Sequence, residues 1–214
     1  MKRKEKFLSG VFFHVFNKSI AGYPIFKDLS NSQRFYQTLI YYNHPNNTIK
    51  FGIFLKKNKD YSPDFFVIND ENIIKIVSYC IMPDHYHLLI KIIKERSFSR
   101  YIGMVENSFS HYFNIKFNRK GPLWQSRFLA VRIKSDEQLL HVSRYIHLNP
   151  TTANLVNRPE DWIFSSYREI ITNSSLLKKT LKEISISTTN SYKKFVENRI
   201  DYQKKLKLIK KCIF

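Results

Sequence analysis

Two apolar runs rich in β-branched residues lie close together near the middle of the chain. The first spans 73–81, the second spans 86–93, and Met82-Pro83-Asp84 interrupts them. Proline has no N–H and a fixed φ, which suits a turn. The pattern therefore predicts two strands folded back on each other around this tripeptide.

Strand-like runs and helical spacing predict the elements on either side of this hairpin. Apolar runs predict a first strand at 10–16 and a last strand at 129–133. Capping residues and apolar stripes predict three helices, at about 28–42, 97–118 and 135–148. Asn149-Pro150 is expected to end the third helix, because a residue before proline is pushed out of helical geometry. Residues 48–70 are interpreted as an insertion or long loop that could include one strand.

The charge balance changes this picture of an ordinary globular chain. The 214 residues carry 36 basic and 17 acidic side chains, a net charge of +19. Such a charge favours a polyanionic partner, with nucleic acid first and an anionic membrane surface second. The five glycines form neither a phosphate-binding loop nor a dinucleotide-binding motif. The sequence thus argues against a nucleotide-binding enzyme.

The expected location is the cytoplasm. An apolar stretch of about 18 residues, as needed to cross a bilayer, is missing from the sequence. The basic N-terminus is followed by an interrupted apolar segment without a small-residue cleavage pattern, which argues against a signal peptide. The two cysteines, Cys80 and Cys212, suggest no disulfide framework and fit a reducing compartment.

The composition shifts near the C-terminus. Residues 171–214 contain 11 basic and 3 acidic side chains, a net charge of +8, and 191–213 has the pattern of a basic amphipathic helix. We therefore expect a domain at 1–170 and a basic, helical extension at 171–214. The helix could present a solvated face, or it could serve as a nucleic-acid arm or partner helix. The segment 159–167, with large aromatic residues, is expected to fold back on the core.

Candidate chemistry begins with a pair of histidines. His85 and His87 are two residues apart on the second central strand, so both side chains leave the same face, while Tyr86 points toward the packed side. Two imidazoles beside a tight turn can form half of a metal site. Two such histidines can equally bond to backbone carbonyls or lie on the surface, so further ligands are needed.

The helix at 135–148 offers a complementary pair. Tyr145 and Asn149 are four residues apart and therefore lie on one face, one turn from each other. An amide oxygen is a hard ligand that Mg²⁺ or Mn²⁺ accepts. A tyrosine hydroxyl one turn away would reach a phosphate held by that metal, which places a nucleophile beside an activator. Taken alone, Tyr145 could equally be a core residue.

Four sequence blocks in this order closely resemble the REP-associated tyrosine transposases, which are relatives of the single-tyrosine HUH transposases of small insertion sequences. The resemblance covers about residues 7–170 and rests on the blocks Met82–Leu89 (MPDHYHLL), Gly121–Phe128 (GPLWQSRF), Tyr145–Pro150 (YIHLNP) and Asp161–Tyr167 (DWIFSSY). It implies an α+β, ferredoxin-like antiparallel sheet packed by helices, and a substrate of single-stranded DNA with hairpins.

The resemblance also implies roles for the candidate residues. His85 and His87 match the metal-binding pair, Asn149 matches the third ligand, and Tyr145 matches the nucleophile. The implied enzyme nicks and rejoins DNA through a 5′-phosphotyrosine, with Mg²⁺ or Mn²⁺ as cofactor. A homodimer and a monomer both remain open. The alternatives are a domesticated, non-catalytic DNA-binding protein and a metal-dependent nucleic-acid phosphodiesterase that uses water.

Several basic and aromatic residues are predicted to contact the DNA. Lys120 and Arg127 flank the loop around Trp124 and are candidates for phosphate contacts. Trp124 could stack on an unpaired base, with core packing about as favoured. The basic N-terminal residues Lys2, Arg3 and Lys4 would add sequence-independent affinity.

Overall fold

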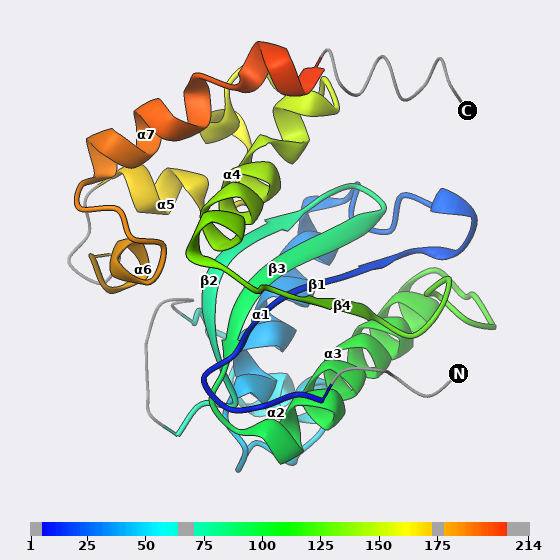
Figure 1. Ribbon diagram of the computed structural model, residues 1–214. Coiled ribbons are helices and arrows are strands. Elements are labelled where there is room, and N and C mark those ends of the chain that lie inside the picture. The colour runs from blue at the N-terminus through cyan, green and yellow to red at the C-terminus, as the bar shows by residue number, and fades with distance from the viewer. Residues whose placement is uncertain (1–5, 64–70, 173–177, 205–214) are drawn as a thin grey trace.

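The computed structural model describes residues 6–63, 71–172 and 178–204. Four strands form one sheet in the order β2-β3-β1-β4, and every neighbouring pair is antiparallel. The elements follow one another as β1 (Phe12–Lys18), α1 (Leu29–Asn43), α2 (Phe51–Lys57), β2 (Ile74–Ile81), β3 (His85–Ile92), α3 (Glu95–Lys116), β4 (Leu129–Arg132), α4 (Asp136–Thr152), α5 (Tyr167–Ile171), α6 (Lys178–Glu183) and α7 (Thr189–Glu197). Short 3-10 turns occupy Ile20–Gly22 and Pro159–Asp161. The β-α-β-β-α-β order and this strand arrangement confirm the expected ferredoxin-like fold (Figure 1).

Helices α1 and α3 cover one face of the sheet and enclose the main core. Alternate residues of β1 are buried, including Phe13 and Val15, and Tyr86 of β3 packs on Phe35 of α1. The hydroxyl of Tyr86 donates a hydrogen bond to Glu106 of α3 at 2.8 Å. This confirms that Tyr86 points away from the face that carries His85 and His87.

Helix α4 lies against the other face of the sheet, and α5 and α7 pack around it (Figure 1). It contacts β2 and β3. Ser135 caps α4 as expected by accepting a hydrogen bond from the backbone N–H of Gln138. The helix therefore faces the strand that carries the two histidines.

The structure corrects the predicted end of α4. The helix continues through Pro150 to Thr152, although Asn149-Pro150 was expected to end it. Proline removes one hydrogen bond and crowds the carbonyl four residues before it, and here both effects fall near the end of the helix. The Ala153 N–H still bonds to the Asn149 carbonyl at 2.9 Å. Asn149 thus stays helical and keeps its spacing from Tyr145.

Three further expectations differ from the structure. The apolar run in 48–70 forms helix α2 and contributes no strand among the described residues; Phe51 is buried and Arg34 stacks on its ring. Helix α3 begins at Glu95 after Lys94, two residues before the expected Ser97, and its acidic first residue suits a helix N-terminus. The helix expected at 191–213 begins at Thr189; α7 ends at Glu197, and residues 200–204 are helical again after a two-residue turn, while residues 205–214 lie outside the described part.

The folded-back segment after α4 behaves as expected. Trp162 donates a hydrogen bond from Nε1 to the Ile81 carbonyl at 2.9 Å, and Tyr167 is fully buried.

In the described ranges, none of the helices is both long enough and apolar enough to cross a membrane.

A buried polar network joins α7 to α4. His147 of α4 is hydrogen-bonded through Nδ1 to the Tyr192 hydroxyl at 2.6 Å and through Nε2 to Ser166 Oγ at 2.7 Å. The Tyr192 hydroxyl also donates to Ser143 Oγ at 3.2 Å. His147 and Tyr192 are fully buried, so His147 serves packing on the side of α4 away from Tyr145.

Tyr192→Phe is expected to lower the free energy of unfolding by about 1–3 kcal/mol, because it leaves a buried nitrogen of His147 without its partner. Urea denaturation followed by circular dichroism measures this. Tyr202→Phe is the matched control, since Tyr202 is exposed and its change should stay within about 0.5 kcal/mol. Equal midpoints for the two variants would contradict a stabilising role for the network.

Candidate active site

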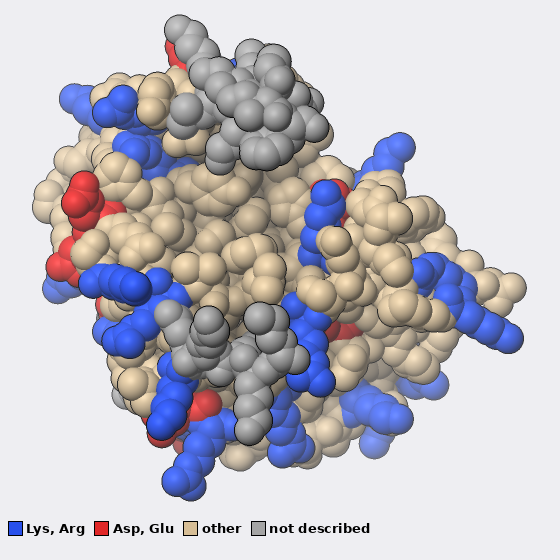
Figure 2. Space-filling model, turned by 45° about the vertical axis from the view of Figure 1, so that its right-hand side comes forward, with Lys and Arg blue, Asp and Glu red and all other residues tan. Residues whose placement is uncertain are grey.

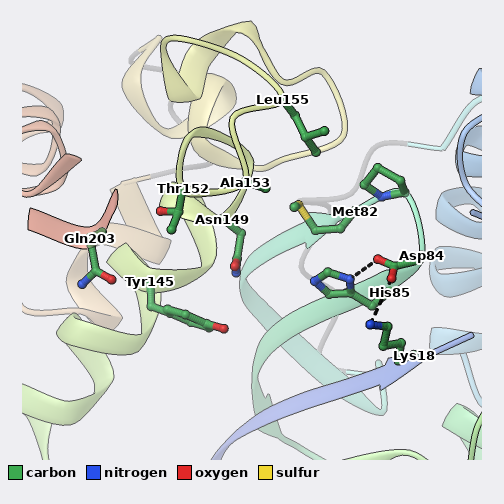
Figure 3. Close-up of a pocket in the computed structure, with 11 residues that line it drawn as sticks. Lys18, Met82, Asp84, His85, Tyr145, Asn149, Thr152, Ala153, Leu155 and Gln203 are labelled. Atoms are coloured by element: carbon green, nitrogen blue, oxygen red, sulfur yellow. Dashed lines mark hydrogen bonds and ion pairs between the residues drawn. The ribbon is translucent and has the colours of Figure 1, made fainter. Parts of the chain in front are cut away.

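A pocket of about 560 Å³ opens between the β2–β3 turn and helix α4. Its lining includes His85, Asp84 and Met82 from the turn side, with Tyr145 and Asn149 from α4. Figure 3 shows these two groups of side chains on opposite walls of the same pocket. The structure therefore brings three of the four predicted central residues to one cavity, and the ring of the fourth, His87, lies next to the rings of His85 and Tyr145.

The two histidines lie on the same face of β3, as their spacing predicts. Their ring centroids are 5.0 Å apart, with the rings nearly perpendicular. His87 is only 7% exposed. Burial, together with the neighbouring His14 and His85, holds the pKa of His87 well below its usual value. His87 is therefore a neutral imidazole near neutral pH, the form that binds metals.

His85 is oriented by a carboxylate. Its Nδ1 lies 2.5 Å from Asp84 Oδ1, and Lys18 Nζ lies 3.2 Å from Asp84 Oδ2 (Figure 3). Burial opposes ionisation of Asp84, but the hydrogen bond with His85 and the ion pair with Lys18 bring its pKa below the usual value. An ionised Asp84 accepts the Nδ1 proton of His85 and so fixes the tautomer and orientation of that ring.

Tyr145 lies against the histidine pair. Its ring centroid is 5.6 Å from that of His87, in an edge-to-face arrangement, and the side chain remains 42% exposed. Burial raises the pKa of Tyr145, and the Asn149 amide next to it acts in the opposite direction. The hydroxyl is thus protonated at neutral pH and accessible from the pocket.

The side-chain amide of Asn149 interacts with Tyr145, and its nitrogen is buried. This Nδ2 atom has no hydrogen-bond partner among the described residues. Such an orphaned group normally has an additional partner. The described residues contain no cluster of three or more His, Cys, Asp or Glu side chains arranged to hold a metal. A metal at this pocket would therefore need a ligand of another type, and the side-chain oxygen of Asn149, which lines the pocket, could provide one.

The predicted DNA-contacting residues are dispersed. Lys120 and Arg127 are exposed. Trp124 is partly buried against Phe26 and Tyr86, and its Nε1 donates to the Glu106 carbonyl at 3.2 Å, so these contacts favour the core-packing alternative. Lys2, Arg3 and Lys4 lie outside the described residues.

Sequence reasoning missed several residues around the site. Asp84 directly precedes His85 in the sequence, and this adjacency could have predicted that its carboxylate orients the His85 ring. Lys18 and His14 lie on β1 beside β3, and single residues on a separate strand give no local pattern. Gln203 reaches the pocket from the C-terminal segment (Figure 3), where composition indicates only a basic helix.

Comparisons with known proteins find similarity to transposases. The family described as "Transposase IS200 like" matches residues 56–149, a range that includes His85, His87, Tyr145 and Asn149. A curated protein of Haemophilus influenzae (strain ATCC 51907 / DSM 11121 / KW20 / Rd), named as a REP-associated tyrosine transposase, is 29% identical over 101 residues. That match covers 42% of this chain and 57% of the relative, so the chain spans little more than half of the relative's length.

A solved structure shares the fold. It is a REP-associated tyrosine transposase bound to a REP hairpin, and it matches with a TM-score of 0.55 and 17% sequence identity. The match covers 81% of this chain and 86% of that chain. At 17% identity this similarity establishes the fold alone. The chemistry has to be argued from the residues of the pocket.

Proposed function

We propose that this chain is a transposase that cuts and rejoins single-stranded, hairpin-containing DNA through a covalent tyrosine intermediate. Its resemblance to the REP-associated tyrosine transposases is confirmed by the family match, the curated relative and the shared fold. The observation that carries the proposed chemistry is the approach of α4 to β3. There Tyr145 and Asn149 share a pocket with His85, and the Tyr145 ring meets the ring of His87.

The residues at this pocket fit a divalent cation. His85 has its Nδ1 committed to Asp84, and His87 has its Nδ1 committed to His14, so Nε2 of each ring is the atom that would bind the ion. The side-chain oxygen of Asn149, on the facing wall of the pocket, would complete the set. The amide oxygen suits Mn²⁺ or Mg²⁺, and the two imidazole nitrogens favour the transition-metal ion of this pair, Mn²⁺. When bound, such an ion would neutralise charge that develops on the scissile phosphate.

Tyr145 is the proposed nucleophile. Its hydroxyl loses its proton, and its oxygen bonds to the phosphorus of the scissile phosphate. The bond from phosphorus to the neighbouring 3′ oxygen breaks, and that oxygen takes up a proton to become a free 3′-hydroxyl. The 5′-phosphotyrosine keeps the energy of the phosphodiester, so attack by another 3′-hydroxyl rejoins DNA without ATP.

The charge distribution supports a nucleic-acid partner. Figure 2 shows a face on which Lys and Arg side chains surround a broad area of other residues, while Asp and Glu are sparse. Exposed Lys120 and Arg127 would contact phosphates. The solved relative is bound to a REP hairpin, and we extend a hairpin substrate to this chain. We assign the transposase domain to 1–170 and a basic extension, whose α7 packs on α4 and α5, to 171–214.

A gel assay with the full chain tests this function. Labelled single-stranded hairpin DNA is incubated with protein and Mn²⁺, and products are separated on denaturing gels with and without protease treatment. The proposal predicts a nicked strand together with a protease-sensitive, slowly migrating adduct. Cleavage without an adduct would instead identify a phosphodiesterase that uses water. Binding without cleavage would identify a non-catalytic DNA-binding protein.

Asp84→Ala is expected to lower Mn²⁺ affinity by about 10–100-fold, because His85 loses the carboxylate that fixes its ring. Titration of free Mn²⁺ by electron paramagnetic resonance measures the affinity. Asp161→Ala is the matched control, since Asp161 is exposed on the Pro159–Asp161 turn. An unchanged affinity in Asp84→Ala would argue that His85 is not a ligand.

A further inference from the structure

A third imidazole lies behind the histidine pair. His14 of β1 is on the same sheet face as His87, because Phe16 pairs directly with His87 and His14 is two residues away along β1. The Nε2 atom of His14 lies 3.0 Å from Nδ1 of His87. The His14 ring also approaches the Tyr145 ring, with centroids 6.1 Å apart. His14 therefore touches both proposed ligand and proposed nucleophile.

A hydrogen bond between two neutral imidazoles can run in either direction, and the direction determines what His87 offers to the pocket. If His14 donates from Nε2, then Nδ1 of His87 is the bare nitrogen and Nε2 of His87 carries the proton. A protonated Nε2 cannot bind a cation. If His87 donates from Nδ1, its Nε2 carries a free lone pair.

The neighbouring His85 indicates the direction of the hydrogen bond between His14 and His87. His85 also has its Nδ1 engaged, and its partner is Asp84, which accepts a proton when ionised. We propose that His14 is a positioning residue that does for His87 what Asp84 does for His85. Its Nε2 accepts the proton of His87 Nδ1 and so turns the Nε2 lone pair of His87 toward the pocket.

The chemistry of the imidazole agrees with this assignment. A neutral His14 ring has one bare nitrogen that can act as acceptor, and its Nε2 is the atom that faces His87. An aspartate in the place of His14 would add a charge next to the Tyr145 ring, whereas a neutral imidazole adds none. The inference rests on the proposed function only where it treats Nε2 of His87 as a ligand atom.

Nitrogen-15 NMR of histidine-labelled, metal-free protein at pH 8 tests the direction of the bond without any activity measurement. We expect His87 to show a protonated Nδ1 and a bare Nε2. In His14→Phe, which keeps a ring but removes the acceptor, His87 should shift toward the other tautomer. His14→Gln, whose side-chain oxygen can accept, should restore the wild-type tautomer. His111→Phe, at an exposed site on α3, is the matched control and should leave His87 unchanged.

Metal binding supplies the second readout. Mn²⁺ affinity should fall by about 10–100-fold in His14→Phe and recover largely in His14→Gln, with circular dichroism showing a folded chain in each. A bare Nδ1 on His87 in the wild-type protein would overturn the proposal, as would a tautomer and affinity unaffected by His14→Phe. If wild-type protein formed no adduct with DNA, the proposed function would fail, while the tautomer of His87 would still decide the role of His14.

Discussion

Replacing Tyr145 with phenylalanine should abolish the covalent protein–DNA adduct and reduce nicking by at least about 10³-fold. The ring would still pack edge-on against His87, so the pocket keeps its shape and loses only the attacking oxygen. Hairpin binding, measured by fluorescence anisotropy, should stay within about twofold. The separation of cleavage from binding distinguishes a lost nucleophile from a misfolded site.

Tyr23→Phe serves as the control for this experiment. Tyr23 is exposed and lies outside the lining of the pocket, so its replacement should leave adduct formation unchanged. Persistent nicking by Tyr145→Phe without an adduct would point to water as the nucleophile. A persistent adduct would assign the chemistry to another tyrosine.

The second large effect is expected at Asn149. Asn149→Ala removes the amide that we assign as the third ligand, and the loss of several kcal/mol of transition-state stabilisation corresponds to about 10²–10³-fold slower nicking. Mn²⁺ affinity should fall in parallel. Measuring the nicking rate at increasing Mn²⁺ concentrations gives both the maximal rate and the apparent Mn²⁺ affinity. A high Mn²⁺ concentration should restore part of the nicking rate of Asn149→Ala.

Two further variants serve as comparisons for Asn149→Ala. Asn149→Asp keeps an oxygen ligand at the same position and should retain metal-dependent nicking. Asn107→Ala, at an exposed position on α3, should behave as wild type. Equal Mn²⁺ dependence in Asn149→Ala and wild type would remove Asn149 from the ligand set and leave its orphaned amide without an explanation.

Local patterns in the sequence predict the parts of the site that depend on spacing along one element. The two-residue interval of His85 and His87 places both on one face of β3, and the four-residue interval of Tyr145 and Asn149 places both on one face of α4. The turn at Met82-Pro83-Asp84 likewise follows from proline chemistry. These predictions need no knowledge of how the strand and helix pack.

Contacts between distant elements could not be predicted in this way. His14 lies 73 residues before His87, and only the register of β1 against β3 reveals that they meet. Gln203 reaches the pocket through the packing of the C-terminal segment. The expected stop at Pro150 failed because a local preference was weighed without the packing of α4 on the sheet.

The central claim is that Tyr145 itself becomes bonded to DNA, and peptide mapping tests it most directly. The wild-type adduct is formed on hairpin DNA with Mn²⁺, trimmed with nuclease, digested with trypsin and analysed by tandem mass spectrometry. Cleavage after Arg144 yields a peptide that begins with Tyr145, and we predict that this tyrosine carries the residual nucleotide. A nucleotide on any other side chain, or cleaved DNA with every tyrosine unmodified, would contradict the account.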